Sequence, residues 1–153
     1  MRKSVIAALL ALGALAAAPA HADSDWRVKA GLLSLDGDSS AAKNAGIVYA
    51  MDFLGILGAE FEANTSIADG EVGAVDYSVL QGGAYATLTT PGPIYFKAKA
   101  GLVYNDLDVG GFSDNDTSEA FGVGVGFTFV EIEYTRSSIN DVDVDFISAS
   151  FGF

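Results

Sequence analysis

The last ten residues of the chain, 144–153, alternate between two kinds of side chain and end on an aromatic residue. In an extended strand, one face would be apolar and the other tiny or polar, because successive side chains point to opposite faces. The apolar face would hold Ile147, Ala149, Phe151 and Phe153, and the other face would hold Ser148, Ser150 and Gly152. This pattern suits a strand between lipid and a narrow polar lumen. It therefore predicts one strand of a transmembrane barrel.

The first residues have the features of an export signal. Arg2 and Lys3 precede an uncharged apolar run over 5–18, and 20–22 is a small-x-small sequence. These features predict a cleaved signal peptide over residues 1–22. A membrane anchor is the alternative, but spanning a bilayer as a helix takes about 20 apolar residues, and this run is shorter.

Residues 23–153 are enough for one domain and too few for two. The chain is acidic, with a net charge of −12, which disfavours nucleic acid as a partner, because phosphate requires clustered Lys and Arg. No cysteine is present, so neither disulfides nor thiolate metal sites are expected. Half of the residues are apolar and they recur at period two. Because lipid offers no partner to an open strand edge, this composition favours a closed barrel.

Eight segments of the chain alternate in this way, which predicts an all-β, eight-stranded antiparallel up-and-down transmembrane barrel. The segments are 26–33, 46–53, 57–64, 75–88, 94–104, 121–129, 130–135 and 144–153. Short turns are expected between strands at 53–55, 90–93 and 129–130, and longer acidic loops at 36–40, 66–73, 105–118 and 137–141. With the first strand starting in the periplasm, the longer loops would be extracellular.

The fourth segment has two possible phases. Its alternation slips between Val79 and Leu80, so either the side chains before the slip or those after it face lipid. A β-bulge near Gly82 and Gly83 would reconcile the two halves.

The signal peptide, eight alternating segments, short turns opposite long loops and the terminal Phe153 resemble the small eight-stranded bacterial outer-membrane barrels, the OmpA transmembrane domain and OmpX group. The resemblance extends over all of 23–153. It implies a monomer in the outer membrane of a Gram-negative bacterium, in contact with membrane lipid and lipopolysaccharide and inserted by the barrel-assembly machinery. Phe151 and Phe153 would form the C-terminal assembly signal.

Charged pairs occupy the polar face of alternate strands, with the sign changing from one pair to the next. These residues are Arg27, Lys29, Glu60, Glu62, Lys97, Lys99, Glu131 and Glu133. An eight-stranded barrel is just wide enough for side chains to fill, and a buried charge without a partner is strongly destabilising. Strands two apart lie about 10 Å from each other, within reach of Lys and Glu. The pattern predicts a salt-bridged layer that closes the lumen.

Catalytic chemistry is not indicated. The only histidine, His21, lies in the predicted signal peptide, so a Ser-His or Cys-His nucleophile is not expected in the mature chain. We therefore expect no enzymatic activity, no cofactor and no metal centre. Four aspartates in the predicted loop 105–118 match calcium sites only loosely. These are Asp106, Asp108, Asp114 and Asp116.

The sequence thus favours a non-enzymatic outer-membrane barrel with a structural or adhesive role through acidic extracellular loops, whose ligand the sequence does not identify. A small porin-like channel is the alternative if the charged layer leaves a water path. A soluble periplasmic lipocalin-like barrel is less favoured, because it would need the apolar face turned inward.

Overall fold

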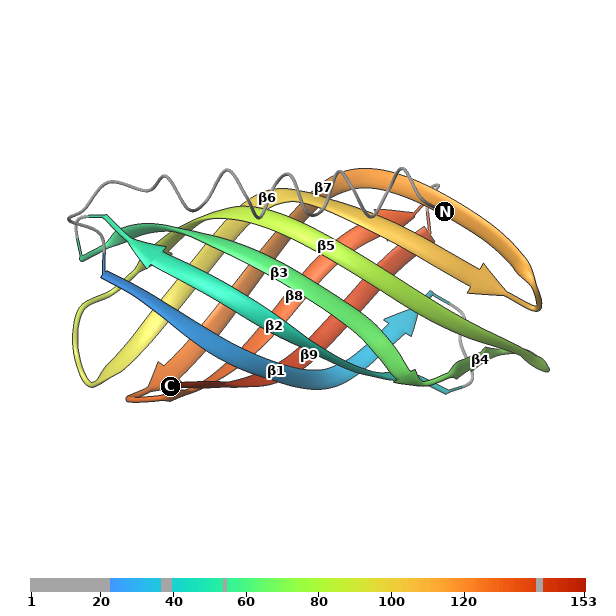
Figure 1. Cartoon of the computed structure of the whole chain (residues 1–153), viewed down its shortest axis with the longest axis horizontal. Coiled ribbons are helices and arrows are strands. Elements are labelled where there is room, and N and C mark those ends of the chain that lie inside the picture. Colours follow the sequence, from blue (N-terminus) through green and yellow to red (C-terminus); the bar gives the residue numbers. More distant parts are fainter. Residues whose placement is uncertain (1–22, 37–39, 54, 140–141) are drawn as a thin grey trace.

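The computed structural model describes residues 23–36, 40–53, 55–139 and 142–153 (Figure 1). The predicted signal peptide over 1–22 lies outside the described residues. The described elements are all strands: β1 (Asp23–Leu35), β2 (Ala42–Asp52), β3 (Leu57–Ala68), β4 (Gly70–Val72), β5 (Val75–Thr89), β6 (Ile94–Val109), β7 (Phe112–Phe127), β8 (Val130–Ile139) and β9 (Val142–Gly152). Within this part of the chain, no helix is long and apolar enough to cross a membrane.

The strands close into an antiparallel barrel. Each neighbour in the order β1, β2, β3, β5, β6, β7, β8, β9 pairs with the next, and β9 pairs back with β1. The three-residue β4 pairs with β5 beyond the last pair of β3 and β5, so β3 and β4 share one place in the circumference. The prediction of a closed eight-stranded antiparallel barrel is confirmed.

The two ends of the barrel differ in their connections. The start of β1 and the end of β9 lie together, and the Phe153 N–H donates to the Trp26 carbonyl at 3.1 Å. The short turns after β2, β5 and β7 lie at this same end, which we call the terminal end (Figure 1). The opposite end holds β4 and the turn between β6 and β7, and we call it the hairpin end (Figure 1).

Apolar side chains cover the outside of the barrel. Val28, Phe96 and Phe127 have exposed fractions of 47%, 63% and 60%. Lys29 and Lys97, which follow Val28 and Phe96, point inward and are buried, as expected for period-two alternation. A soluble lipocalin-like barrel would need the reverse arrangement, with the apolar face lining the cavity.

The strands extend further at the hairpin end than the sequence predicts. Residues 105–118, expected as the longest loop, instead complete β6 and begin β7, and the turn is only Gly110 and Gly111, both with positive φ. The expected loop over 66–73 is likewise mostly the end of β3 followed by β4. These two loop predictions were wrong, because the apolar alternation ends where the outer apolar belt ends while the backbone pairing continues.

The proposed bulge in β5 is also wrong. The register of β5 with both neighbours runs without a shift through Gly82 and Gly83. Tyr77 and Val79 point into the barrel and are buried, whereas Leu80 points outward. The alternation only seemed to slip because the lumen is apolar at the hairpin end, so the inward face of β5 changes from apolar to polar along its length.

Candidate functional site: the filled lumen

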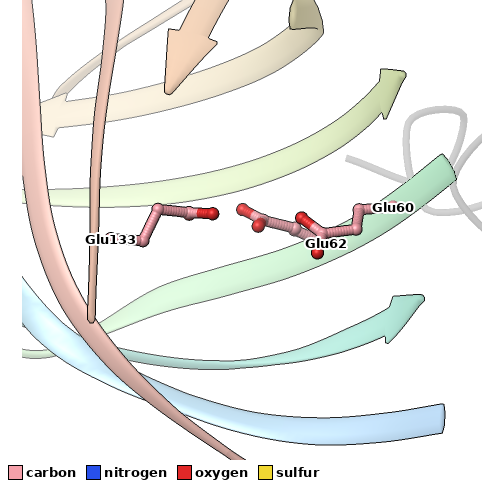
Figure 2. Close-up of side chains that lie close together, drawn as sticks. All are labelled: Glu60, Glu62 and Glu133. Carbon is pink, nitrogen blue, oxygen red and sulfur yellow. The ribbon is translucent and has the colours of Figure 1, made fainter. Parts of the chain in front are cut away.

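Eight charged side chains meet inside the barrel near the terminal end, and we call them the charged layer. They are Arg27 and Lys29 on β1, Glu60 and Glu62 on β3, Lys97 and Lys99 on β6, and Glu131 and Glu133 on β8. All but Arg27 are buried. Figure 2 shows the three carboxylates of Glu60, Glu62 and Glu133 directed toward one another from β3 and β8.

The half of the charged layer further from the terminal end is a closed ring of two lysines and two glutamates. Lys29 Nζ lies 2.7 Å from both Glu62 Oε1 and Glu133 Oε1. Lys99 Nζ lies 2.6 Å from the same two oxygens. Each cation therefore touches two anions and each anion touches two cations. We call these four residues the ion ring.

The half nearer the terminal end centres on Lys97. Its Nζ lies 2.7 Å from Glu60 Oε1, 2.5 Å from Glu131 Oε1 and 2.7 Å from Glu133 Oε2, so Glu133 joins this half to the ion ring. Arg27 Nη1 donates to Glu131 Oε2 at 3.0 Å. The eight charges thus form one connected network with four cations and four anions.

Strand direction and parity explain why these residues meet. β1, β3, β6 and β8 all start at the terminal end, so pairs placed early in each strand have a similar depth. The strands between them supply small inward residues, Gly122 and Gly124 on β7 and Ser148 and Ser150 on β9. A Cβ on Gly122 would lie only 2.8 Å from Lys99 Cε. Because Gly122 has no side chain, β7 leaves the space that the Lys99 side chain occupies.

Three contacts to the charged layer were not foreseen from the sequence. Asp25 accepts from Arg27 Nε at 2.8 Å. The Lys99 ammonium lies 4.1 Å from the centre of the Tyr85 ring, and the Lys29 ammonium lies 5.5 Å from that of Phe146. Both are within the range of cation–π attraction. The sequence indicates these contacts only through the alternation of side chains along each strand. This alternation places Asp25 on the same face as Arg27, and Tyr85 and Phe146 on the inward faces of their strands.

At the hairpin end the lumen is filled by apolar side chains instead, and we call this group the apolar plug. It comprises Leu33, Leu35, Ala42, Tyr77, Val79, Ile139, Val144 and Phe146. The Tyr77 hydroxyl donates to the Leu33 carbonyl at 3.0 Å and accepts from the Ala42 N–H at 3.2 Å. Tyr77 therefore fastens β5 to the facing ends of β1 and β2 while filling the centre.

Amides lie between the charged layer and the apolar plug. Gln81 donates from Nε2 to Asn105 Oδ1 at 2.7 Å, and Ser66 donates to Asn44 Oδ1 at 2.9 Å. All but Ser66 of these four side chains are buried. The lumen is therefore occupied at three successive levels, charged, polar and apolar.

A cavity of about 210 Å³ opens at the terminal end of the charged layer. Its lining includes Arg27, Asp52, Tyr95, Lys97 and Glu131, together with threonines of β5 and the β5–β6 turn. Arg27, the one member of the layer that is not fully buried, faces this cavity. We call it the vestibule.

Three carboxylates of the charged layer lie close together and are paired with lysines. Carboxylate oxygens of Glu60, Glu62 and Glu133 lie within 4.8 Å of one another, a spacing that a cation could bridge. The lysine ammoniums already contact these oxygens at 2.6–2.7 Å, so the positive charge is supplied by the chain.

The four aspartates expected in a loop do not converge. Asp106 and Asp108 lie opposite Asn115 and Ser113 in the β6–β7 ladder, whereas Asp114 and Asp116 lie opposite Leu107 and Asn105. Residues directly opposite each other share a face of the sheet, so the two pairs point to opposite sides. The structure therefore does not bring all four into one site.

The aromatic residues at the end of β9 point away from the lumen. Phe151 and Phe153 have exposed fractions of 50% and 84% and belong to the outer apolar belt. Phe151 lies opposite Val28 on one side and Val130 on the other, which places it at the seam where the barrel closes.

A closed barrel with an apolar exterior and a filled, charge-balanced interior defines the class of small eight-stranded membrane barrels. Residues 5–153 match the outer membrane protein beta-barrel domain, and the chain belongs to that family. No curated protein sequence matches the chain.

Solved structures share this fold at low identity. Neisserial surface protein A (NspA) has a TM-score of 0.60 and 18% identity, covering 86% of this chain and 97% of its own. The N-terminal barrel domain of Pseudomonas aeruginosa OprF has a TM-score of 0.59 and 10% identity, covering 84% and 97%. Ail of Yersinia pestis, in complex with the heparin analogue sucrose octasulfate, has a TM-score of 0.53 and 14% identity, covering 86% and 97%.

Proposed function

We propose that this chain is a non-enzymatic integral protein of the Gram-negative outer membrane, with a closed lumen and a structural or adhesive role through its acidic hairpin end. The observation that supports this most is the reversal of the usual soluble arrangement, with large apolar residues outside and eight charges inside. Soluble monomers rarely expose apolar patches larger than a few hundred Å². A surrounding bilayer removes the free-energy cost of exposing these apolar side chains to water.

The orientation follows from the connections. Outer-membrane barrels have short periplasmic turns and longer extracellular segments. At the terminal end the exposed apolar residues Ile94, Phe127 and Phe129 lie next to the turns, whereas at the hairpin end β6 and β7 continue beyond the apolar belt. We therefore place the terminal end in the periplasm and the hairpin end outside the cell. In this orientation Phe151 and Phe153 act as an assembly signal for the barrel-assembly machinery, and a cleaved peptide over 1–22 accounts for export.

A closed lumen is supported by its three levels of filling. Ion pairs at 2.5–3.0 Å hold the side chains of the charged layer across the barrel. Removing a partner from a buried pair leaves an uncompensated charge, so the layer resists partial opening. The apolar plug offers no polar path at the other end.

The hairpin end suggests the kind of partner. The charged layer has equal numbers of cations and anions, so the net charge of −12 arises elsewhere in the chain. Acidic residues at the hairpin end include Asp76, Asp106, Asp108, Glu119 and Asp143. A polyanion such as the heparin analogue in the Ail structure is poorly matched to this surface, so we expect a cationic partner.

Membrane integration is tested by the migration of the extracted protein on a gel before and after boiling. A closed barrel resists detergent until heated, so the unboiled protein should migrate differently from the boiled one. Release of the protein by a salt wash, with no change on boiling, would contradict the proposal. Protease applied to intact cells should cut the hairpin between β6 and β7 if the orientation is right.

A small channel is the second candidate, and the vestibule favours it. The vestibule is lined by Arg27, Glu60, Lys97 and Glu131, so the ion ring, the amides and the apolar plug separate it from the outside. Recording from planar bilayers separates the candidates. Steady unitary conductance of the purified chain would support the channel, and its absence in bilayers shown to contain folded protein would support the closed lumen.

A further inference from the structure

The vestibule has the size of a site for a small molecule. Its volume of about 210 Å³ far exceeds the ~30 Å³ that one water molecule occupies in the liquid. Pockets for drug-sized ligands measure about 300–1,000 Å³, so an occupant of the vestibule has only a few heavy atoms. The residues of its wall determine which chemistry such an occupant needs.

The cations that line the vestibule are already paired with carboxylates of the chain. The Lys97 ammonium contacts three glutamates at 2.5–2.7 Å. The Arg27 guanidinium contacts Asp25 at 2.8 Å and Glu131 at 3.0 Å. An anionic ligand would have to displace these partners, so the wall is poorly suited to bind an anion.

Carboxylates are in excess at the mouth of the vestibule. None of the ion pairs among the described residues includes Asp52, which lies on the wall. Asp23 lies directly opposite Asp52 on β1, and Asp25 follows on the same face of that strand. The charged layer is balanced, with four cations and four anions, so these three aspartates add uncompensated negative charge. The mouth therefore attracts cations.

A buried hydroxyl lies beside the Asp52 carboxylate. Thr87 lines the vestibule with only 6% of its surface exposed, and among the described residues its hydroxyl has no hydrogen-bond partner. Both oxygens lie over Gly58, because a Cβ there would be 2.7 Å from Thr87 Oγ1 and 2.9 Å from Asp52 Oδ1. They are therefore close enough for one ammonium group to donate to both at ordinary hydrogen-bond lengths.

We propose that the vestibule binds the ammonium group of a small primary alkylamine, with Asp52 as its counter-ion and the Thr87 hydroxyl as a second acceptor. Ala50, Pro91 and Tyr95 also line the vestibule and offer apolar surface to a short alkyl chain. A calcium ion would need about six to eight oxygen ligands, which these two side chains do not supply. An ammonium group needs only a few acceptors and therefore matches the site.

This site lies at the opposite end of the barrel from the acidic hairpin end, so it goes beyond the proposed adhesive role. Only the source of the amine, the periplasm, rests on the proposed orientation. Cleavage after residue 22 would create an α-ammonium group on Asp23. Backbone nitrogens of a strand lie in the plane of the sheet, so this group would not project into the lumen as the Asp52 side chain does.

The test uses isotope-labelled protein purified from the membrane and held in zwitterionic micelles, whose surface carries no net charge. The probe is n-butylamine, which is protonated at neutral pH like a lysine side chain. Tetramethylammonium carries the same charge without N–H donors and is the control ligand. In NMR spectra, n-butylamine should shift the amide signals of Asp52 and Thr87 in a saturable way and leave Gly110 at the hairpin end unchanged.

Three protein variants separate the specific contacts from general attraction. Asp52→Asn should weaken binding of n-butylamine at least about tenfold, because a hydrogen bond between two charged groups is lost. Thr87→Val keeps the shape and removes the hydroxyl, and should weaken binding about two- to tenfold. Asp23→Asn is the matched control, since it removes one exposed charge at the same mouth. It should weaken binding about threefold at most, because attraction through water is weak.

Equal shifts with n-butylamine and tetramethylammonium would overturn the inference, because the acidic mouth would then attract any cation. Equal losses for Asp52→Asn and Asp23→Asn would overturn it for the same reason. Absence of a saturable shift in protein that migrates on a gel as a folded barrel would also refute it. Binding in micelles does not depend on orientation in the cell, so a chain that passes the gel and protease tests but binds no amine would refute the amine site alone.

Discussion

The charged layer and the apolar plug fill the same lumen in two different ways. The charged layer uses directional contacts, in which each ammonium is held by two or three carboxylates at 2.5–2.7 Å. The apolar plug uses non-directional packing, with a single hydroxyl, that of Tyr77, satisfying backbone groups on two strands. Loss of one partner should therefore be felt across the whole charged layer, whereas loss in the apolar plug should scale with the volume removed.

The comparison also separates stability from specificity. Replacing a complete buried ion network by apolar residues is often neutral or stabilising, although breaking it is costly. The charged layer matches strands of opposite sign across the barrel, which disfavours wrong registers. The apolar plug has no such preference, so we assign it a larger share of the net stability.

The largest loss of stability is expected for Glu133→Leu. Glu133 contacts Lys29, Lys97 and Lys99, so its removal leaves three ammoniums sharing fewer anions. We expect a loss of about 3–5 kcal/mol in the free energy of unfolding, measured with guanidinium in lipid vesicles. Glu119→Gln, at an exposed position on β7, is the control and should change little. A small loss for Glu133→Leu would mean that water reaches the charged layer freely.

Leu33→Ala probes the apolar plug. Leu33 is fully buried, and its truncation should cost about 2–5 kcal/mol, in proportion to the cavity left behind. The neighbouring Leu32 points outward with 51% of its surface exposed. Leu32→Ala in the same unfolding measurement should cost less. Equal costs would contradict the assignment of Leu33 to a packed interior.

Tyr77→Phe removes the one hydroxyl of the apolar plug and leaves the packing almost unchanged. The Leu33 carbonyl and the Ala42 N–H would each lose a partner, at a cost of about 1–3 kcal/mol. Hydrogen exchange of the Ala42 amide should speed up in the same variant. Unchanged exchange would show that this hydrogen bond does not hold the ends of the strands.

The smallest net change in the free energy of unfolding is expected when all four residues of the ion ring are replaced by apolar residues. A chain with Lys29→Met, Lys99→Met, Glu62→Leu and Glu133→Leu should unfold within about 1 kcal/mol of the wild type, or be more stable. Its folded fraction after refolding should fall if the charges select the register. A large loss of stability together with full folding yield would reverse the division of roles.

Much of the fold follows from the sequence, because alternate side chains of a barrel strand face lipid and lumen and therefore differ in polarity. The alternation of Phe96 and Lys97, repeated along the chain, gave the strand number and the inward charges. The lengths of the strands did not follow, since residues 105–118 are polar on both faces beyond the apolar belt and read as a loop. The sequence left open which face of β5 points inward. Tyr77 and Val79 face an apolar lumen, and side-chain alternation alone cannot distinguish an apolar lumen from lipid.

The sequence predicted which residues form the charged layer, but not which of them form ion pairs with each other. Sign alternation by strand and the small residues between the charged strands indicated that lysines reach glutamates, but the sequence does not determine which ammonium contacts which carboxylate. The participation of Tyr85 and Phe146 likewise depends on depth in the barrel.

The most direct test of the central claim is a double-mutant cycle on Lys99 and Glu62, whose charged atoms lie 2.6 Å apart. Lys99→Met and Glu62→Gln together leave Lys29 and Glu133 paired at 2.7 Å, so the double variant keeps a complete ion pair. Each variant and the double variant would be unfolded in lipid vesicles, with Lys99→Met plus Val144→Ala in the apolar plug as the control cycle. We predict that the double variant loses less stability than the two single losses added together, by about 0.5–3 kcal/mol, while the control cycle is additive. Additive losses for Lys99 and Glu62 would contradict a closed, charge-paired lumen.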